Sequence, residues 1–62
     1  MGEEIKQIAA RIREIREISG LTPEELAREL GVALDLYRSY EEGIEDIPVG
    51  FLYKFAQKFQ LE

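Results

Sequence analysis

The 62-residue chain contains no cysteine and no histidine. This excludes disulfide bonds and thiolate chemistry, and it removes most zinc sites and most pairs of nucleophile and base. The sequence also has no glycine-rich phosphate loop and no calcium loop of spaced Asp and Asn residues. We therefore expect a protein that is not an enzyme and that binds no metal and no cofactor.

Targeting signals are also absent from the sequence. The N-terminal residues MGEEIKQ lack the basic and apolar blocks of a signal peptide, and Lys6 stands where a myristoylation signal needs Ser or Thr. The lack of cysteine fits a reducing compartment. We expect a cytoplasmic protein without a membrane anchor.

The composition is that of a folded protein. Hydrophobic residues make up 45% of the chain and charged residues 34%, which favours a globular domain over a disordered tail or a membrane span. A chain of this length forms one small domain, here residues 1–62, and buries only roughly 60% of the surface of the unfolded chain. Its large apolar residues are therefore all needed for stability.

Apolar spacing predicts four helices. A stripe of Ile and Ala at three- and four-residue steps predicts a first helix from about 3 to 19, ended by Gly20. Thr22 and Glu25 form the pattern of a capping box for a second helix over 23–30, which Gly31 ends. A third helix is predicted over 34–42 and a fourth from Pro48 to about 59 or 60.

These helices predict an all-α bundle with a single core. The predicted core residues are Ile8, Ile12, Ile15, Leu21, Leu26, Ala27, Leu30, Val32, Tyr37, Tyr40, Leu52, Phe55 and Phe59. Phe and Tyr at helical spacing indicate core packing, because a stacking platform for nucleic acid also needs basic neighbours. At the C-terminal end, we expect Phe51, Tyr53, Phe59 and Leu61 to lack partners within the chain and to favour self-association.

The pattern RIREIREISGLTPEELARELGV…YRSYEEG…IP…FLYKFAQKF resembles the lambda-repressor-like helix-turn-helix family of the Cro/repressor or XRE type. The resemblance covers nearly the whole chain and implies a small bundle that presents its third helix, about 34–42, to the major groove of DNA. The segment DIPVGFLYKFA is most similar to regulators that carry a C-terminal sensor domain, often a cupin barrel. Because the family usually continues into a fifth helix, missing or cut off here, we expect a domain excised from a longer regulator.

The resemblance also implies roles for individual residues. It places Leu34, Asp35, Arg38 and Ser39 at the major groove, and it places Pro23, Arg28 and the backbone N–H groups of Val49 and Gly50 near phosphates. Arg13 is a further candidate for a phosphate contact. The resemblance also implies a structural ion pair between Arg16 and Glu41, which would join the first helix to the third.

The charge of this region opposes DNA binding. Between Thr22 and Gly50, two arginines stand against eight carboxylates, a net charge of −6. Pro23 replaces a Gln that is common in the family, and Ala33 replaces a usual Ser or Thr cap worth about 1 kcal/mol. Since DNA readers gain affinity by neutralising phosphates, the isolated monomer is expected to bind duplex DNA weakly.

Two functions remain open from the sequence. The first is a DNA-binding module of a transcriptional regulator, assembled as a homodimer through the C-terminal helix or a missing downstream domain. The alternative is a protein-interaction or assembly module that kept the fold and lost DNA affinity, with Leu34 and Leu36 as partner anchors.

Overall fold

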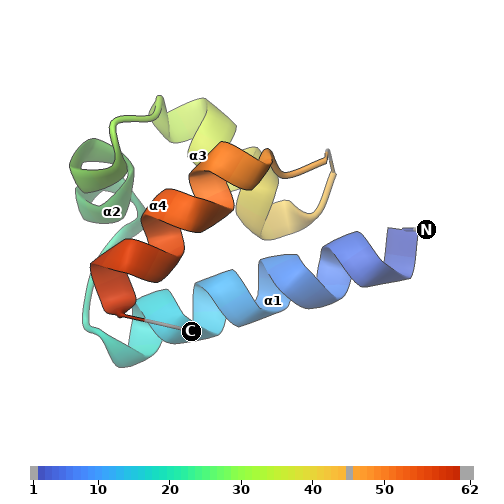
Figure 1. The fold of residues 1–62 in the computed structure, drawn as a ribbon, viewed down its shortest axis with the longest axis horizontal. Helices are drawn as coiled ribbons and strands as arrows, with labels where there is room; N and C mark the ends of the chain where they lie inside the picture. Colours follow the sequence, from blue (N-terminus) through green and yellow to red (C-terminus); the bar gives the residue numbers. More distant parts are fainter. Residues whose placement is uncertain (1, 45, 61–62) are drawn as a thin grey trace.

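The structure is a computed structural model that describes residues 2–44 and 46–60. Within these residues the chain forms four helices and no strand (Figure 1). They are α1 (Gly2–Ile18), α2 (Pro23–Leu30), α3 (Leu34–Glu42) and α4 (Val49–Phe59). The prediction of an all-α bundle is confirmed. The predicted bounds of α2 and α3 agree with the structure, whereas α1 begins and ends one residue earlier than predicted.

The helix ends follow from local chemistry. The Thr22 hydroxyl accepts a hydrogen bond from the Glu25 N–H, and the Glu25 carboxylate accepts one from the Thr22 N–H, so the capping box is formed. Gly31 and Gly43 end α2 and α3 with φ values of 73° and 70°, which glycine adopts without strain. Pro48 precedes α4 as its N-cap, so the helix begins one residue later than predicted.

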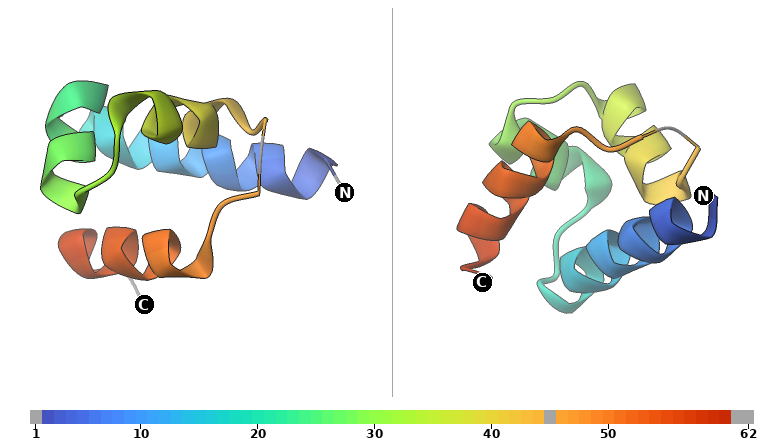
Figure 2. Two further views of the ribbon diagram at one scale, coloured as in Figure 1. Left: turned by 90° about the horizontal axis from the view of Figure 1, so that it is seen from above. Right: turned by 45° about the vertical axis from the view of Figure 1, so that its right-hand side comes forward.

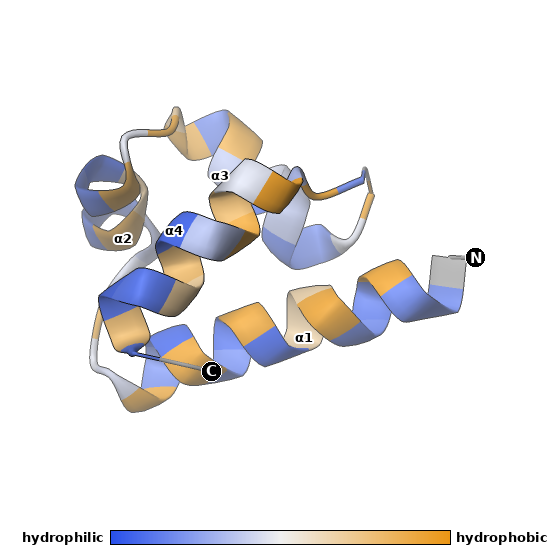
Figure 3. Cartoon of the chain, in the orientation of Figure 1, coloured by the Kyte–Doolittle hydropathy of each residue, from blue (hydrophilic) through white to orange (hydrophobic). Residues whose placement is uncertain are grey.

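Each helix contributes buried residues to a common core, and apolar residues recur at intervals along each helix in Figure 3. α3 packs against both α1 and α2, while α4 packs on α2 (Figure 2). Leu26 and Tyr37 are completely buried. The Phe51 ring lies 4.8 Å from the ring of Tyr40, and the Phe55 ring lies 4.8 Å from that of Phe59, measured between centroids. These aromatic pairs join α4 to α3 and continue along α4.

Two assignments of burial from the sequence are wrong. Ile8 is 42% exposed, because it lines an open hollow between α1 and α4 together with Leu52, Phe55 and Ala56. Phe51 is only 5% exposed, because its ring fits among those of Tyr37, Tyr40 and Phe55. Tyr53 is exposed as expected, and Phe59 is half-buried. Leu61 lies outside the described residues.

Among residues 2–44 and 46–60, no helix combines the length and the apolar character that a crossing of the bilayer requires.

Candidate nucleic-acid interface

α2 and α3 form a helix-turn-helix. Val32 N–H donates to the Ala27 carbonyl at 3.0 Å, and Gly31 N–H donates to the Arg28 carbonyl at 3.2 Å, so the chain leaves α2 in a tight turn. α3 then begins at Leu34, and the side chain of its N-cap residue, Ala33, gives no cap hydrogen bond. Tyr37 and Tyr40 anchor one side of α3 in the core. The other side is open to solvent.

The exposed side of α3 is acidic with one arginine. Its exposed residues are Asp35, Leu36, Arg38 and Glu42. Of the other residues predicted at the groove, Leu34 is half-buried and packs against the core, and Ser39 is half-buried. The Ser39 hydroxyl donates to the Leu36 carbonyl at 2.7 Å. The structure therefore brings Asp35 and Arg38 together on one open surface and leaves Leu34 and Ser39 less accessible.

Arg38 is held by a carboxylate of the preceding helix. One of its guanidinium nitrogens lies 3.2 Å from Oε2 of Glu24, with the two side chains 54% and 57% exposed. Arg38 also lines a hollow of about 270 Å³ between α1, the start of α2 and α3. The other residues lining it are Arg13, Arg16, Pro23, Glu41 and Glu42. The hollow that Arg38 lines therefore carries both arginines and carboxylates.

The predicted phosphate contacts do not form one surface. Arg28 lines a different hollow, of about 510 Å³, with Lys54 and Lys58 of α4. Lys58 is paired with Glu29 at this place. Val49 and Gly50 are exposed in the first turn of α4, where their N–H groups precede the first hydrogen bond of the helix, from Leu52 N–H to the Pro48 carbonyl at 3.1 Å.

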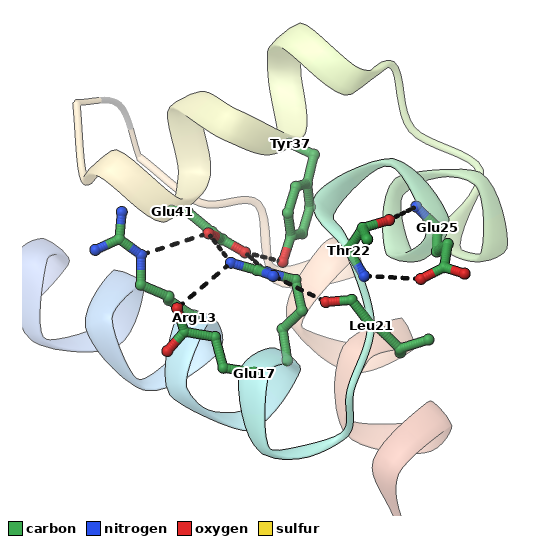
Figure 4. A network of polar contacts seen from close by, with 8 residues as sticks. Arg13, Glu17, Leu21, Thr22, Glu25, Tyr37 and Glu41 are labelled. Atoms are coloured by element: carbon green, nitrogen blue, oxygen red, sulfur yellow. Dashed lines mark hydrogen bonds and ion pairs between the residues drawn. The ribbon is translucent and has the colours of Figure 1, made fainter.

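Arg16 and Glu41 meet in a nearly buried network (Figure 4). Arg16 Nε lies 2.6 Å from Glu41 Oε2, and the two side chains are 10% and 7% exposed. Arg16 also donates to the Leu21 carbonyl at 2.8 Å, and the Tyr37 hydroxyl donates to Glu41. The hydrogen bond to Glu41 raises the pKa of Arg16, and burial raises the pKa of Tyr37 above its usual range. The network joins α1, the α1–α2 connection and α3.

Three of these contacts were missed from the sequence. They are the Tyr37 hydroxyl bond to Glu41, the approach of Arg13 Nε to within 3.7 Å of Glu41, and the Arg38–Glu24 pair. The four-residue spacing of Tyr37 and Glu41 on one helix was a usable signal for the first. The other two join different helices, 28 and 14 residues apart in the chain, and no local pattern indicates them.

No group of three or more acidic side chains among the described residues is arranged to hold a metal ion. The polar groups at the site are carboxylates, guanidinium groups and hydroxyls, of which those of Arg16, Arg38 and Glu41 are held in ion pairs.

The comparison with known protein families agrees with this geometry. The family model described as Helix-turn-helix matches residues 12–62. The chain therefore belongs to the helix-turn-helix family, of the XRE type, whose fold is that of DNA-binding transcription regulators. Neither a curated protein nor a solved structure matches the chain.

Proposed function

We propose that the protein is the DNA-binding module of a transcriptional regulator and that it inserts α3 into the major groove. One observation carries the proposal: α3 is anchored by Tyr37 and Tyr40 on one side and presents Asp35, Leu36 and Arg38 on the other. In a helix-turn-helix, this outward side of the second helix contacts base edges.

The proposal gives distinct roles to four residues of α3. Arg38 supplies hydrogen-bond donors for guanine or a phosphate, and Ser39 can donate once its hydroxyl turns from the Leu36 carbonyl. Leu36, and the part of Leu34 outside the core, fit a thymine methyl group. Asp35 accepts only from cytosine and repels phosphates.

Weak binding by one copy is part of the proposal. A net charge of −6 between Thr22 and Gly50 opposes the phosphate lattice, so a second α3 in the next major groove, about 34 Å away, is needed for useful affinity. We propose a homodimer formed through α4 or through a further domain. The DIPVGFLYKFA segment supports a regulator with a sensor domain of the cupin type.

Titration of fluorescent duplexes tests the function. The chain and a form fused to a dimerising coiled coil are titrated at about 50 mM salt, where phosphate attraction is only modestly screened. Arg38→Ala should weaken binding, and Asp35→Asn combined with Glu42→Gln should strengthen it by removing repulsion. If neither the dimerised chain nor its neutralised variant binds, the proposal is refuted.

A protein-interaction module is the second candidate, and the exposure of Leu36 favours it. Leu36 is 41% exposed on an acidic surface, which suits a partner with an apolar anchor and a basic rim. Retention on heparin at low salt separates the candidates, because only a phosphate-binding surface is retained on a polyanion.

A further inference from the structure

We propose that Glu24 competes with DNA for Arg38 and thereby limits the affinity of the interface. The inference rests on the proposed function and names a residue that regulates the same site. Glu24 belongs to the first turn of α2, whereas Arg38 belongs to α3, so the contact crosses the helix-turn-helix. This contact engages Arg38, the one cationic residue on the exposed side of α3.

The geometry makes the carboxylate a mimic of a phosphate oxygen. Glu24 Oε2 lies 3.2 Å from a guanidinium nitrogen of Arg38, within hydrogen-bond range, and it presents to this donor the same kind of charged oxygen as a phosphate does. Both side chains are more than half exposed, so water reaches the pair and the contact is easily exchanged. A phosphate approaching the hollow beside Pro23 competes with Glu24 for this nitrogen of Arg38.

The other arginines at this hollow are restrained in the same way. Arg16 is nearly buried and bound by Glu41, and Arg13 lies 3.7 Å from the same carboxylate. The Arg16–Glu41 pair has a structural reason, because it joins α1 to α3 beside the core. The Glu24–Arg38 pair lies on the surface and contributes little to the core, so its main consequence is for the availability of Arg38.

A matched control separates this competition from simple charge repulsion. Replacing any carboxylate near the interface by its amide removes one negative charge and relieves repulsion of DNA. Glu42 is such a control, because it is exposed, lines the same hollow as Arg38 and forms no ion pair with any residue in the ranges 2–44 and 46–60. Only Glu24→Gln also removes the charge that holds Arg38, because the amide oxygen that remains accepts a weaker hydrogen bond.

The experiment is a double-mutant cycle read by duplex binding. Glu24→Gln and Glu42→Gln are each made in the wild-type chain and in Arg38→Ala, and all variants carry the same dimerising helix. Circular dichroism checks that each variant is folded. Labelled duplex is titrated at about 50 mM and 150 mM salt.

We expect Glu24→Gln to tighten binding about two- to fivefold more than Glu42→Gln does, the range set by the strength of an exposed ion pair. In the Arg38→Ala background, the two amide substitutions should have equal effects. Equal effects in the wild-type background, or an extra gain that survives removal of Arg38, would overturn the inference while leaving DNA binding intact. Absence of binding by every variant would overturn the proposed function and this inference with it.

Discussion

Breaking the Arg16–Glu41 pair should unfold much of the population of the isolated domain. Both side chains are at most 10% exposed, so removing one partner leaves a charge that water hardly reaches. Such a change costs about 3–5 kcal/mol. A domain of this length has a free energy of unfolding of roughly 3–9 kcal/mol, at about 0.05–0.15 kcal/mol per residue. One substitution therefore removes a large part of the total stability.

The two single substitutions should not be equivalent. After Arg16→Met, Glu41 keeps the hydroxyl of Tyr37 and gains a freer approach of Arg13, already 3.7 Å away. After Glu41→Leu, Arg16 keeps only the Leu21 carbonyl and the distant carboxylate of Glu17 at 4.0 Å. We therefore expect Glu41→Leu to lower the free energy of unfolding by about 1 kcal/mol more than Arg16→Met does.

Urea unfolding at low temperature, with an osmolyte added equally to all samples, measures both variants and the double variant. The double variant should be more stable than additivity predicts by at least about 1 kcal/mol, because no charge is left unpaired. The control is the exposed pair Arg11–Glu14, whose side chains are 74% and 65% exposed. Its coupling should stay below about 1 kcal/mol. Additive effects of Arg16→Met and Glu41→Leu would refute this reasoning.

Three further predictions concern the glycine caps, acid stability and association. Gly43→Ala should destabilise the domain more than Gly31→Ala does. Both residues have positive φ, but only at Gly43 would an added Cβ lie 3.2 Å from a backbone atom, Lys6 Cα. Thermal unfolding measures both variants, and equal losses of about 1–2 kcal/mol would contradict the added clash. The hydrogen bond from the Thr22 N–H holds the pKa of Glu25 below its usual 4.5, so the ionised carboxylate stabilises the fold above pH 4.5 and this stabilisation is lost as pH falls through the lower pKa of the folded state. Glu25→Gln should therefore reduce the fall of the urea midpoint at acid pH. An unchanged fall would exclude the capping box as its source. Tyr53, 63% exposed on α4, should support self-association worth about 2 kcal/mol, visible by sedimentation at rising concentration and weakened by Tyr53→Lys; a monomer at every concentration would argue against it.

The helices were predictable because their signals are local. Thr22, Glu25 and Gly31 each act within one turn of the position they define, so the bounds of α2 follow from the sequence. The burial of a side chain was predictable only where the apolar side of its own helix is covered by a neighbouring helix. Ile8 has the correct spacing for the core, but no helix of the described chain covers it, and its exposure depends on how far α4 lies from α1. Phe51 was expected to lack partners but is buried, because two of the rings that cover it, those of Tyr37 and Tyr40, come from α3.

The sequence predicted where the candidate site lies, but not which of its side chains are already bound by other residues. The side of α3 that points outward follows from the buried spacing of Tyr37 and Tyr40. That Arg38 is paired with Glu24 does not follow, because the contact depends on the angle between two helices. The same holds for Arg28, whose neighbours in space, Lys54 and Lys58, belong to α4.

The Arg16 network has a consequence for protein engineering. The guanidinium of Arg16 bonds to the Leu21 carbonyl before α2 and to Glu41 at the far end of α3, so a peptide spanning only the two helices would lose both of these bonds and their burial. The recognition unit is therefore not portable as a fragment. The exposed positions of α3 can be varied instead. Asp35, Leu36 and Arg38 are exposed, and a library of substitutions at these three positions would test new specificities while the core stays unchanged.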